Sequence, residues 1–335
     1  MSWSAEVVFD DASGDRLMGL WSAPGKQVQV IGLGSGVYRV QVFTDLDHRV
    51  PPVAIMDGST AKDGSVTFAP AKEGTTPSDH TKQKPAWWPV PVGSTAWKAT
   101  WKNETFTLNQ ADGTLVTLTP APLESPTLGL VPPVDAVVLL NATSTAETVA
   151  RDWVTVKGGK PCPWTLLPGG ILQGVPKSGT IISRRTFASH RIHLEFRLPY
   201  EPARRGQERA NSGLYLQGRY EIQILDSFGL QGADNECGGI YKIAVPQVNR
   251  CAPPGTWQTY DVEFTAAEFA SNAQSTSARV SVRHNGGVIH VDQPISAPTG
   301  SATVPAGAGP GGVCLQDHDH PVQFRNVWVV PTATP

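Results

Sequence analysis

Strict alternation of apolar and polar residues recurs along most of this 335-residue sequence. Segments such as QVQVI (27–31), YRVQVF (38–43) and RIHLEFRL (191–198) carry an apolar residue at every second position or nearly so. Because successive side chains of a strand point to opposite faces, this period is typical of strands buried on one side. The sequence also holds 33 glycines and 29 prolines, many of them between these segments, where turns are expected. The pattern predicts an all-β protein.

The first part of the sequence, residues 1–119, predicts a small antiparallel β domain. Strands are expected at 27–31, 38–43, 65–68, 96–101, 105–108 and 114–118. Gly32–Gly36 reads as the turn of a hairpin, and three Asp-Gly pairs predict further turns. These pairs are Asp57-Gly58, Asp63-Gly64 and Asp112-Gly113. Residues 120–136 contain five prolines and no alternation, which predicts a linker between two domains.

The second domain, residues 137–335, predicts a two-sheet sandwich of the jelly-roll type, because many short strands follow one another with frequent turns. Its strands are expected at 179–183, 191–198, 212–216, 220–225, 258–264, 279–284, 288–291 and 321–330. Asn285-Gly286-Gly287 predicts a hairpin turn. Two short helices are expected, at Ser144–Trp153 with Ser144 or Thr145 as N-cap, and at Ala266–Ala270.

Charge and hydropathy exclude two classes of partner. The 27 Lys+Arg and 29 Asp+Glu give a formal net charge of −2, and no basic stripe exists to neutralise nucleic-acid phosphates. No apolar run approaches the roughly 18–20 residues of a membrane span. The first twenty residues hold four carboxylates and no hydrophobic signal core. We expect a periplasmic or secreted protein lacking its leader, with a cytoplasmic protein as the alternative.

The four cysteines, Cys162, Cys237, Cys251 and Cys314, form no C-x-x-C pair, so a structural zinc site is not expected. Cys237 and Cys251 bracket a 13-residue loop containing glycine and proline. A disulfide closing a loop of that length would contribute about 3 kcal/mol. The sequence therefore predicts a Cys237–Cys251 disulfide, and buried thiols are the alternative.

Candidate binding residues come from the polar sides of three predicted strands. In residues 191–198 the apolar set leaves Glu195 and Arg197 on the opposite face; in residues 212–225 it leaves Tyr215, Gln217, Glu221 and Gln223. If these strands are neighbours, one sheet face carries carboxylate, amide, guanidinium and phenol groups together. Sugar hydroxyls need such donors and acceptors, and a sugar ring needs a flat surface on which to stack. The alternative is an ordinary solvated sheet face.

The segment from Glu221 to Asp226 is more specific. Its spacing is similar to the E-x-D-x-x-E pattern of laminarinase- and lichenase-type β-glucanases, which supplies their nucleophile and acid/base. Two positions depart from it, because the middle carboxylate is Gln223 and the last is the shorter Asp226. A neutral middle residue cannot shift the pKa of its neighbours by charge. These departures argue against the ordinary retaining mechanism.

A second cluster places Asp317, His318, Asp319 and His320 in succession after a glycine-rich run. Such a loop could bind a divalent metal, or could supply a base that titrates near neutral pH. The alternative is the polar entry to the last strand, which we favour over a metal site. No other cofactor is expected.

From about residue 137 to 331 the sequence resembles the 3-keto-disaccharide hydrolase domain family. The stretches that carry the resemblance are HLEFRLP, ANSGLYLQGRYEIQILDSFG, CGGIYKIAVPQVNRCAPPGTWQTYDVEF, RVSVRHNGGVIH and LQDHDHPVQFRNVWV. The N-terminal part also resembles a small β domain that precedes this one in some members. The resemblance implies a concanavalin-like jelly roll that acts on sugars already oxidised at C3. Lys242, where glycine is expected, and His320, where a small or amide residue is common, depart from the family pattern.

A ketone at C3 acidifies the C2 proton, so one base, one acid and a partner for the enolate oxygen suffice for cleavage by elimination. At positions that the resemblance supplies, we assign Glu221 or Asp226 to acid/base work and His318 to proton transfer. Lys242 and Arg219 are candidates for stabilising the enolate. The residues expected to bind substrate hydroxyls are Glu195, Arg197, Asn211, Tyr215, Gln217, Gln223 and Asp317; Asn211 also reads as a plain turn residue.

Three other functions remain open at this point. A jelly roll can serve as a non-catalytic carbohydrate-binding module. It can also be an ordinary retaining endo-glucanase, against which Gln223 argues. A third possibility is a structural role in a surface assembly, with Trp87-Trp88 as the docking patch, although two tryptophans beside prolines more often close a small core. We expect a small carbohydrate as the partner.

Overall fold

The computed structural model describes residues 15–77, 82–270 and 273–332. They form two compact units. The first contains the chain up to Leu123 with the segments Tyr200–Arg209 and Ser227–Gln231, and the second contains the rest. Residues 1–14, which hold most of the region where no signal core was expected, lie outside the described residues.

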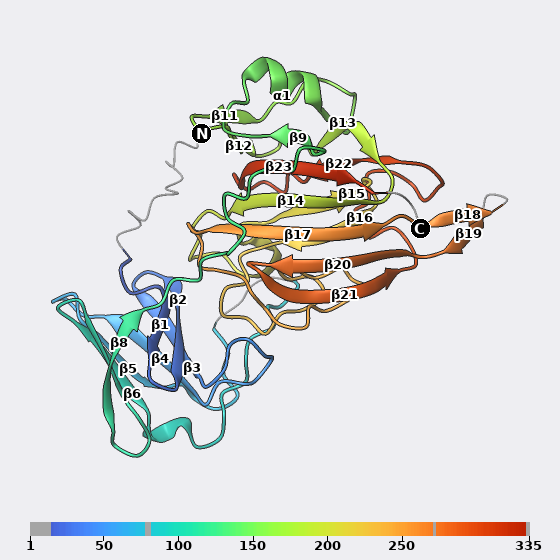
Figure 1. Ribbon diagram of the computed structural model, residues 1–335. Coiled ribbons are helices and arrows are strands. Elements are labelled where there is room, and N and C mark those ends of the chain that lie inside the picture. Colours follow the sequence, from blue (N-terminus) through green and yellow to red (C-terminus); the bar gives the residue numbers. More distant parts are fainter. Residues whose placement is uncertain (1–14, 78–81, 271–272, 333–335) are drawn as a thin grey trace. The chain divides into compact units, whose positions relative to one another are not determined.

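The first unit is built on a closed antiparallel barrel in which each strand pairs with the next and β8 returns to β1. Its strands are β1 (Gly19–Ala23), β2 (Lys26–Gly34), β3 (Val37–Phe43), β4 (Ala54–Thr60), β5 (Val66–Pro70), β6 (Lys98–Lys102), β7 (Thr105–Asn109) and β8 (Leu115–Pro120) (Figure 1). Short 3₁₀ turns lie at η2 (Ser94–Ala96) and η3 (Gly206–Glu208). The alternating residues of these strands fill the interior, as in other eight-stranded barrels. Val28, Val40, Phe68 and Phe106 are fully buried there.

One turn prediction in the barrel is wrong. Asp57-Gly58 lies inside β4 and not between strands. The Asp57 carboxylate accepts two hydrogen bonds, 2.8 and 2.9 Å long, from the buried guanidinium of Arg39 on β3. A Cβ atom at Gly58 would lie 2.6 Å from the Phe68 ring, so the glycine serves close packing between strands.

Trp87 and Trp88 are both buried, at 8% and 7% exposed. Trp88 packs edge-on against Phe43 with ring centroids 6.0 Å apart, and the Arg39 guanidinium lies over Trp87 at 5.9 Å. The two tryptophans therefore close a small core, and the docking-patch alternative is wrong.

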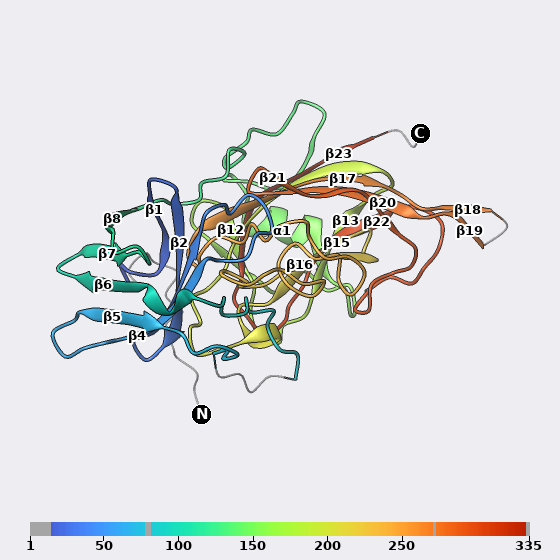
Figure 2. The same cartoon turned by 90° about the horizontal axis from the view of Figure 1, so that it is seen from below.

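The second unit is a sandwich of two antiparallel sheets. The order of the five-stranded sheet is β10 (Trp153–Thr155), β13 (Ile181–Phe187), β22 (Gly311–Leu315), β15 (Ser212–Leu216) and β16 (Tyr220–Ile224). The order of the larger sheet is β11 (Thr165–Leu167), β12 (Ile171–Gln173), β23 (Gln323–Pro331), β14 (His190–Arg197), β17 (Trp257–Thr265), β20 (Ala278–His284) and β21 (Gly287–Ile295), and β9 (Val137–Leu140) pairs with β23. Figure 2 shows β17, β20, β21 and β23 in one layer and β15 and β16 in the other.

The core of the sandwich lies between the two sheets. Leu194 and Phe196 of β14 and Leu214 and Ile222 of β15 and β16 are all at most 1% exposed. Since side chains alternate along a strand, the polar residues of β14 face outward from the larger sheet and those of β15 and β16 face outward from the five-stranded sheet. The sandwich therefore has two different polar outer faces.

The helix expected at Ser144–Trp153 is confirmed as α1 (Ala146–Asp152). Thr145 caps it: its hydroxyl accepts from the Thr148 backbone N–H, and the Thr148 hydroxyl accepts from Thr145 N–H. The helix expected at Ala266–Ala270 is wrong. That segment contains strand β18 (Glu268–Ala270), which pairs with β19 (Ala273–Thr276), because one turn of helix is less stable than a hairpin ladder.

The all-β prediction is confirmed. So is the hairpin at Asn285-Gly286, where both residues have positive φ and join β20 to β21. No helix in the described part of the chain is long and apolar enough to cross a membrane.

Candidate active site

The outer face of β15 and β16 collects polar side chains that have almost no exposure. The strands pair antiparallel with Tyr215 opposite Glu221 and Gly213 opposite Gln223. Tyr215 is fully buried, and Glu221 and Gln223 are 1% exposed each. Burying a carboxylate is costly unless it is paired or protonated, so the surroundings of Glu221 decide its chemistry.

The position of Glu221 is set by its backbone hydrogen bond and by close packing against Gly213 on β15. Its backbone N–H donates to Thr299 Oγ1 at 3.1 Å. A Cβ atom at Gly213 would lie 2.5 Å from Glu221 Oε1, so glycine at this position leaves room for the carboxyl group. Oε2 is buried and has no hydrogen-bond partner among the residues that the structure describes. One oxygen of this buried carboxyl group therefore lacks a hydrogen-bond partner among the described residues.

Burial raises the pKa of Glu221 to about 7, against a smaller lowering by a hydrogen bond from Tyr215. A carboxyl group with that pKa exists in both protonation states near neutral pH. It can therefore accept a proton in one step and donate one in another, which is the property that general acid/base catalysis requires.

Tyr215 links Glu221 to the end of β22. The Tyr215 hydroxyl accepts a hydrogen bond of 2.8 Å from Gln316 Nε2, and it is also hydrogen-bonded to Glu221 and Ser301. Burial first, and then the charge of Glu221, raise the pKa of Tyr215 above its ordinary value. The phenol consequently stays protonated and orients the Glu221 carboxyl group.

Arg219, supported by Gln217, binds the segment 305–309, which precedes β22. Arg219 donates from Nε to Pro305 O at 2.9 Å and from Nη1 to Gly309 O at 3.2 Å. It also donates to Gln217 Oε1 at 3.1 Å, while Gln217 Nε2 donates to Phe187 O at 3.1 Å. Both side chains thus fix the backbone of the fold, and contact with substrate by either stays a prediction.

Gln223 lies against the loop that follows β16. Its backbone exchanges hydrogen bonds with Gly238 and Gly239, and its Nε2 donates to Asn235 O at 3.4 Å. Asp226, two residues beyond the end of β16, is 4% exposed, and Asn211, just before β15, is 1% exposed. These three predicted residues therefore lie on, or next to the ends of, β15 and β16, the strands that form the face with Glu221.

Lys242 lies in the same loop and is exposed. Its Nζ pairs with Asp234 Oδ1 at 3.5 Å and lies 5.8 Å from the centre of the Tyr241 ring. Its φ of 59° is in the left-handed region, where glycine is favoured. The resemblance led us to expect glycine at this position, and the structure has a lysine there in a conformation that favours glycine.

The Asp317–His320 loop follows Gln316. The Asp317 carboxylate accepts from the backbone N–H groups of Gly179 at 2.7 Å, Asp319 at 3.0 Å and Lys177 at 3.3 Å, which fixes the loop. His318 is exposed and its ring stacks with that of the buried His320, with centroids 6.4 Å apart. Within the described ranges, no group of three or more His, Cys, Asp or Glu side chains is arranged to hold a metal ion.

The sequence of residues 135–330 matches the family described as the 3-keto-alpha-glucoside-1,2-lyase-like domain. The match spans more than half of the chain. This chain belongs to that family. The resemblance predicted from its motifs is thereby confirmed. Apart from residues 200–209 and 227–231, which group with the barrel, the matched residues lie in the sandwich unit, which is a carbohydrate-active domain of the glycosyl-hydrolase-like kind.

Solved structures show similar proteins. A candidate glycosyl hydrolase from Parabacteroides distasonis is 32% identical with a TM-score of 0.52, over 60% of this chain and 85% of that one. A second candidate glycosyl hydrolase from the same organism is 18% identical with a TM-score of 0.40, over 58% of this chain and 100% of that one. A carbohydrate-binding module from Bacillus subtilis is 13% identical with a TM-score of 0.31, over 52% and 93%. No curated protein matches the sequence.

Glu195 and Arg197 lie on the other outer face of the lyase-like domain. The condition that their strand neighbours β15 and β16 is not met, because β14 pairs with β17 and β23 in the larger sheet. Glu195 accepts from Arg325 Nε at 2.7 Å and Asn326 Nδ2 at 2.9 Å. Arg197 lies 4.9 Å from the centre of the Trp257 ring and donates to Gln323 Oε1. Neither side chain joins the Glu221 group.

The predicted disulfide of the lyase-like domain is not formed in the structure. Cys237 and Cys251 are buried thiols, which is the alternative that the sequence left open. They are hydrogen-bonded to each other, and Cys237 Sγ also lies 3.2 Å from Tyr260 Oη.

Sequence reasoning missed the residues that hold Tyr215 and Glu221 in place. Gln316, Thr299 and Ser301 come from a strand end and from a loop with no alternation, so periodicity gave no signal for them. Gly213 had a signal, since it lies within the strand expected at 212–216, where a glycine often marks close packing.

Proposed function

We propose that the lyase-like domain cleaves the glycosidic bond of sugars that carry a ketone at C3, with Glu221 as the acid/base. The observation that supports this most is the carboxyl group of Glu221, which is buried beside Tyr215, has one oxygen without a partner among the described residues, and has a pKa of about 7. The name of the matching family points to the same substrate class.

The chemistry needs no oxocarbenium ion. A base removes the proton on C2, and the electron pair forms an enolate with the C3 oxygen. The enolate then re-forms the ketone, a C1–C2 double bond appears, and the bond from C1 to the leaving oxygen breaks; that oxygen takes a proton. Water can add across the double bond to give the free 3-keto sugar, so the same site can act as a lyase or as a hydrolase.

Each of these residues has one proposed role. Glu221 takes the C2 proton, and Tyr215 keeps its carboxyl group oriented. Asp226 or His318 supplies the proton for the leaving oxygen, and Asn211 and Gln223 bind hydroxyls.

The enolate oxygen needs a cation or a hydrogen-bond donor. Arg219 already donates to three oxygens of the fold, whereas Lys242 is exposed and its ion pair with Asp234 is long, at 3.5 Å. Lys242 is therefore the better of the two predicted candidates.

The test compares a 3-keto-glucoside with its parent glucoside. The wild-type protein should release the aglycone from the keto substrate alone. Glu221→Gln should lower that rate by about 10²–10⁴-fold, the usual contribution of a general acid/base. Glu268→Gln, an exposed glutamate on β18, is the matched control and should retain the wild-type rate.

Two results would contradict the proposal. One is cleavage of the parent glucoside alone or of neither substrate; binding of the keto sugar without turnover would then indicate a carbohydrate-binding module. The other is a Glu221→Gln variant that keeps its fold and the wild-type rate.

A further inference from the structure

The barrel unit contains a pocket of its own, with a volume of about 390 Å³. It opens where β6 turns into β7 and where β4 turns into β5. Pockets that hold small molecules begin at roughly 300 Å³, so this volume suits a ligand of one or two rings. Apolar side chains fill the interior of the barrel, so this pocket is distinct from the barrel core.

The pocket combines half-buried aromatic rings with polar groups. Trp101 and Tyr38 both line it and are both partly exposed. Trp21 and Phe106 contact the Trp101 indole edge-on, with centroids 5.5 and 6.5 Å away, and these contacts fix the orientation of the ring. A fixed and partly exposed indole is a surface on which a sugar ring can stack.

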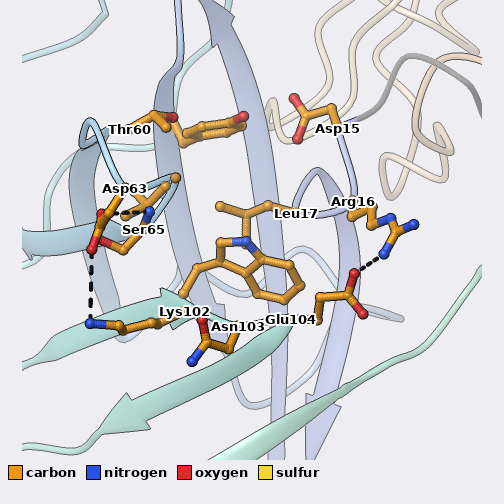
Figure 3. A pocket seen from close by; sticks show the side chains of 13 residues that line it. Asp15, Arg16, Leu17, Thr60, Asp63, Ser65, Lys102, Asn103 and Glu104 are labelled. Carbon is orange, nitrogen blue, oxygen red and sulfur yellow. Dashed lines mark hydrogen bonds and ion pairs between the residues drawn. The ribbon is translucent and has the colours of Figure 1, made fainter.

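Four of the five charged side chains around the pocket form two ion pairs. Figure 3 shows Arg16 paired with Glu104 on one side, and Lys102 paired with Asp63 at 3.8 Å on the other. The remaining carboxylate, Asp15, accepts from Met18 N–H at 3.1 Å and from the Tyr200 hydroxyl at 3.0 Å. An anionic ligand finds no surplus of positive charge here, and the surplus carboxylate of Asp15 is already hydrogen-bonded, whereas a neutral ligand finds many donors and acceptors.

The turn that carries Glu104 is strained. Asn103 and Glu104 join β6 to β7 with φ of 49° and 59°, a two-residue hairpin turn whose second position favours glycine. Glutamate in the left-handed region costs roughly 1 kcal/mol or more. Strain of this kind in a turn that forms a pocket wall points to a use for the side chain there.

We propose that this pocket is a non-catalytic binding site for a neutral saccharide of one or two rings. The ring stacks on Trp101, and its hydroxyls bond to Glu104, Lys102, Asp63 and Asn103. This site belongs to the barrel unit and does not depend on the chemistry at Glu221.

The test uses the full chain labelled with ¹⁵N and follows the indole N–H signals during titration with cellobiose, maltose and sucrose. The Trp101 signal is assigned from Trp101→Phe. It should shift saturably with at least one sugar. The signal of Trp153, whose Nε1 donates to Leu139 O inside the sandwich, should not shift. No saturable shift of Trp101 with any of the three sugars would overturn the proposal.

Glu104→Gly separates binding from folding. Glycine relieves the strained turn and the lost ion pair is exposed, so the melting temperature should stay the same or rise. The affinity for the sugar should fall by about tenfold, the loss expected for one hydrogen bond to a charged group. Asp112→Asn, in the exposed turn between β7 and β8, is the control and should bind as wild type.

Cleavage of the 3-keto-glucoside should be unchanged in Glu104→Gly, so a failure of this proposal is distinguishable from a failure of the proposed function. Wild-type affinity in Glu104→Gly together with wild-type affinity in Trp101→Leu would show that the sugar binds elsewhere.

Discussion

Glu195 and Glu221 are equally buried glutamates whose surroundings move their pKa values in opposite directions. Burial acts to raise the pKa of both. At Glu195, hydrogen bonds from His193, Asn326, Arg325 and the Gly129 backbone outweigh it and lower the pKa to about 2. Glu221 has only the phenol of Tyr215 to offset burial, and its pKa rises to about 7. The first is a permanent anion that ties strands together, and the second is a group that can exchange protons.

The pH dependence of kcat/KM should follow Glu221. As the base it must be deprotonated, so activity should rise with pH through about 7. Tyr215→Phe removes the hydrogen bond that lowers this pKa, so the rising limb should move to higher pH. A pH–rate profile of wild type and Tyr215→Phe measures both. If the rising limb of the profile did not shift in Tyr215→Phe, the ionisation that it reports would not be that of Glu221.

Glu195→Gln should destabilise the sandwich without changing the active-site pKa. It breaks a buried ion pair with Arg325, at a cost of about 3 kcal/mol. The folded pKa is below the unfolded one, so this stabilisation is present above about pH 4.5 and is lost as pH falls toward about 2. Urea unfolding measures the cost. A variant as stable as wild type would show that the network does not stabilise the fold.

Single residues could be predicted from the sequence only in part. Glu221 and Tyr215 stand out because they belong to the polar set of the alternation on two consecutive strands. Glu195 carries the same signal, yet the structure places it in an ionic network on the other sheet. Periodicity gives the face of a strand but not the sheet to which the strand belongs, so sequence reasoning could not separate them.

At the scale of elements, β15 is shaped around the Glu221 carboxyl group at Gly213. Gly213→Ala should lower kcat with little loss of stability, because the new Cβ would lie 2.5 Å from Oε1 and would displace the end of that side chain. Gly307→Ala is the control, since a Cβ there meets nothing within 4 Å. Steady-state kinetics and melting temperatures of both variants test this. Equal kcat values would contradict it.

Local turn chemistry predicted some elements and failed at others. Asn285-Gly286 forms the expected hairpin because both residues tolerate positive φ. Asp57-Gly58 carries a similar signal but lies within β4, where the Arg39 ion pair and packing on Phe68 override the turn preference. The pairing of β18 with β19 likewise overrides a weak helical pattern at 266–270.

At the scale of the whole molecule, the sandwich should be sensitive to acid. Burial lowers the pKa of His190 to about 4, and burial with the charge of Arg250 lowers that of His284 to about 3. As the pH decreases below the unfolded pKa of about 6.5, the unfolded chain binds these protons before the folded chain does. The free energy of unfolding therefore decreases as the pH is lowered, by a few kcal/mol in total. His193, whose pKa is raised by Asp261 and Glu195 against burial, acts the other way.

Melting temperatures between about pH 7 and pH 5 measure this slope. The double variant His190→Gln, His284→Gln should have a flatter slope than wild type, whatever its stability at neutral pH. His48→Gln, at an exposed histidine of the barrel, should keep the wild-type slope. An equally steep slope in the double variant would rule out the two buried histidines as its source.

The strand content and the all-β class follow from alternation, but the order of strands in the sheets does not. Only long-range pairing places β22 between β13 and β15 and so brings Gln316 to Tyr215. Nothing in the local sequence of residues 200–209 and 227–231 predicts that these segments group with the barrel unit.

The central claim is that Glu221 removes the C2 proton of a 3-keto sugar. The most direct test follows a 3-keto-glucoside by proton NMR in D₂O. Wild type should lose the C2 proton signal before or together with cleavage of the C1–oxygen bond, and Glu221→Gln should do neither at a comparable rate. Cleavage in which the product retains its original C2 proton would contradict the account.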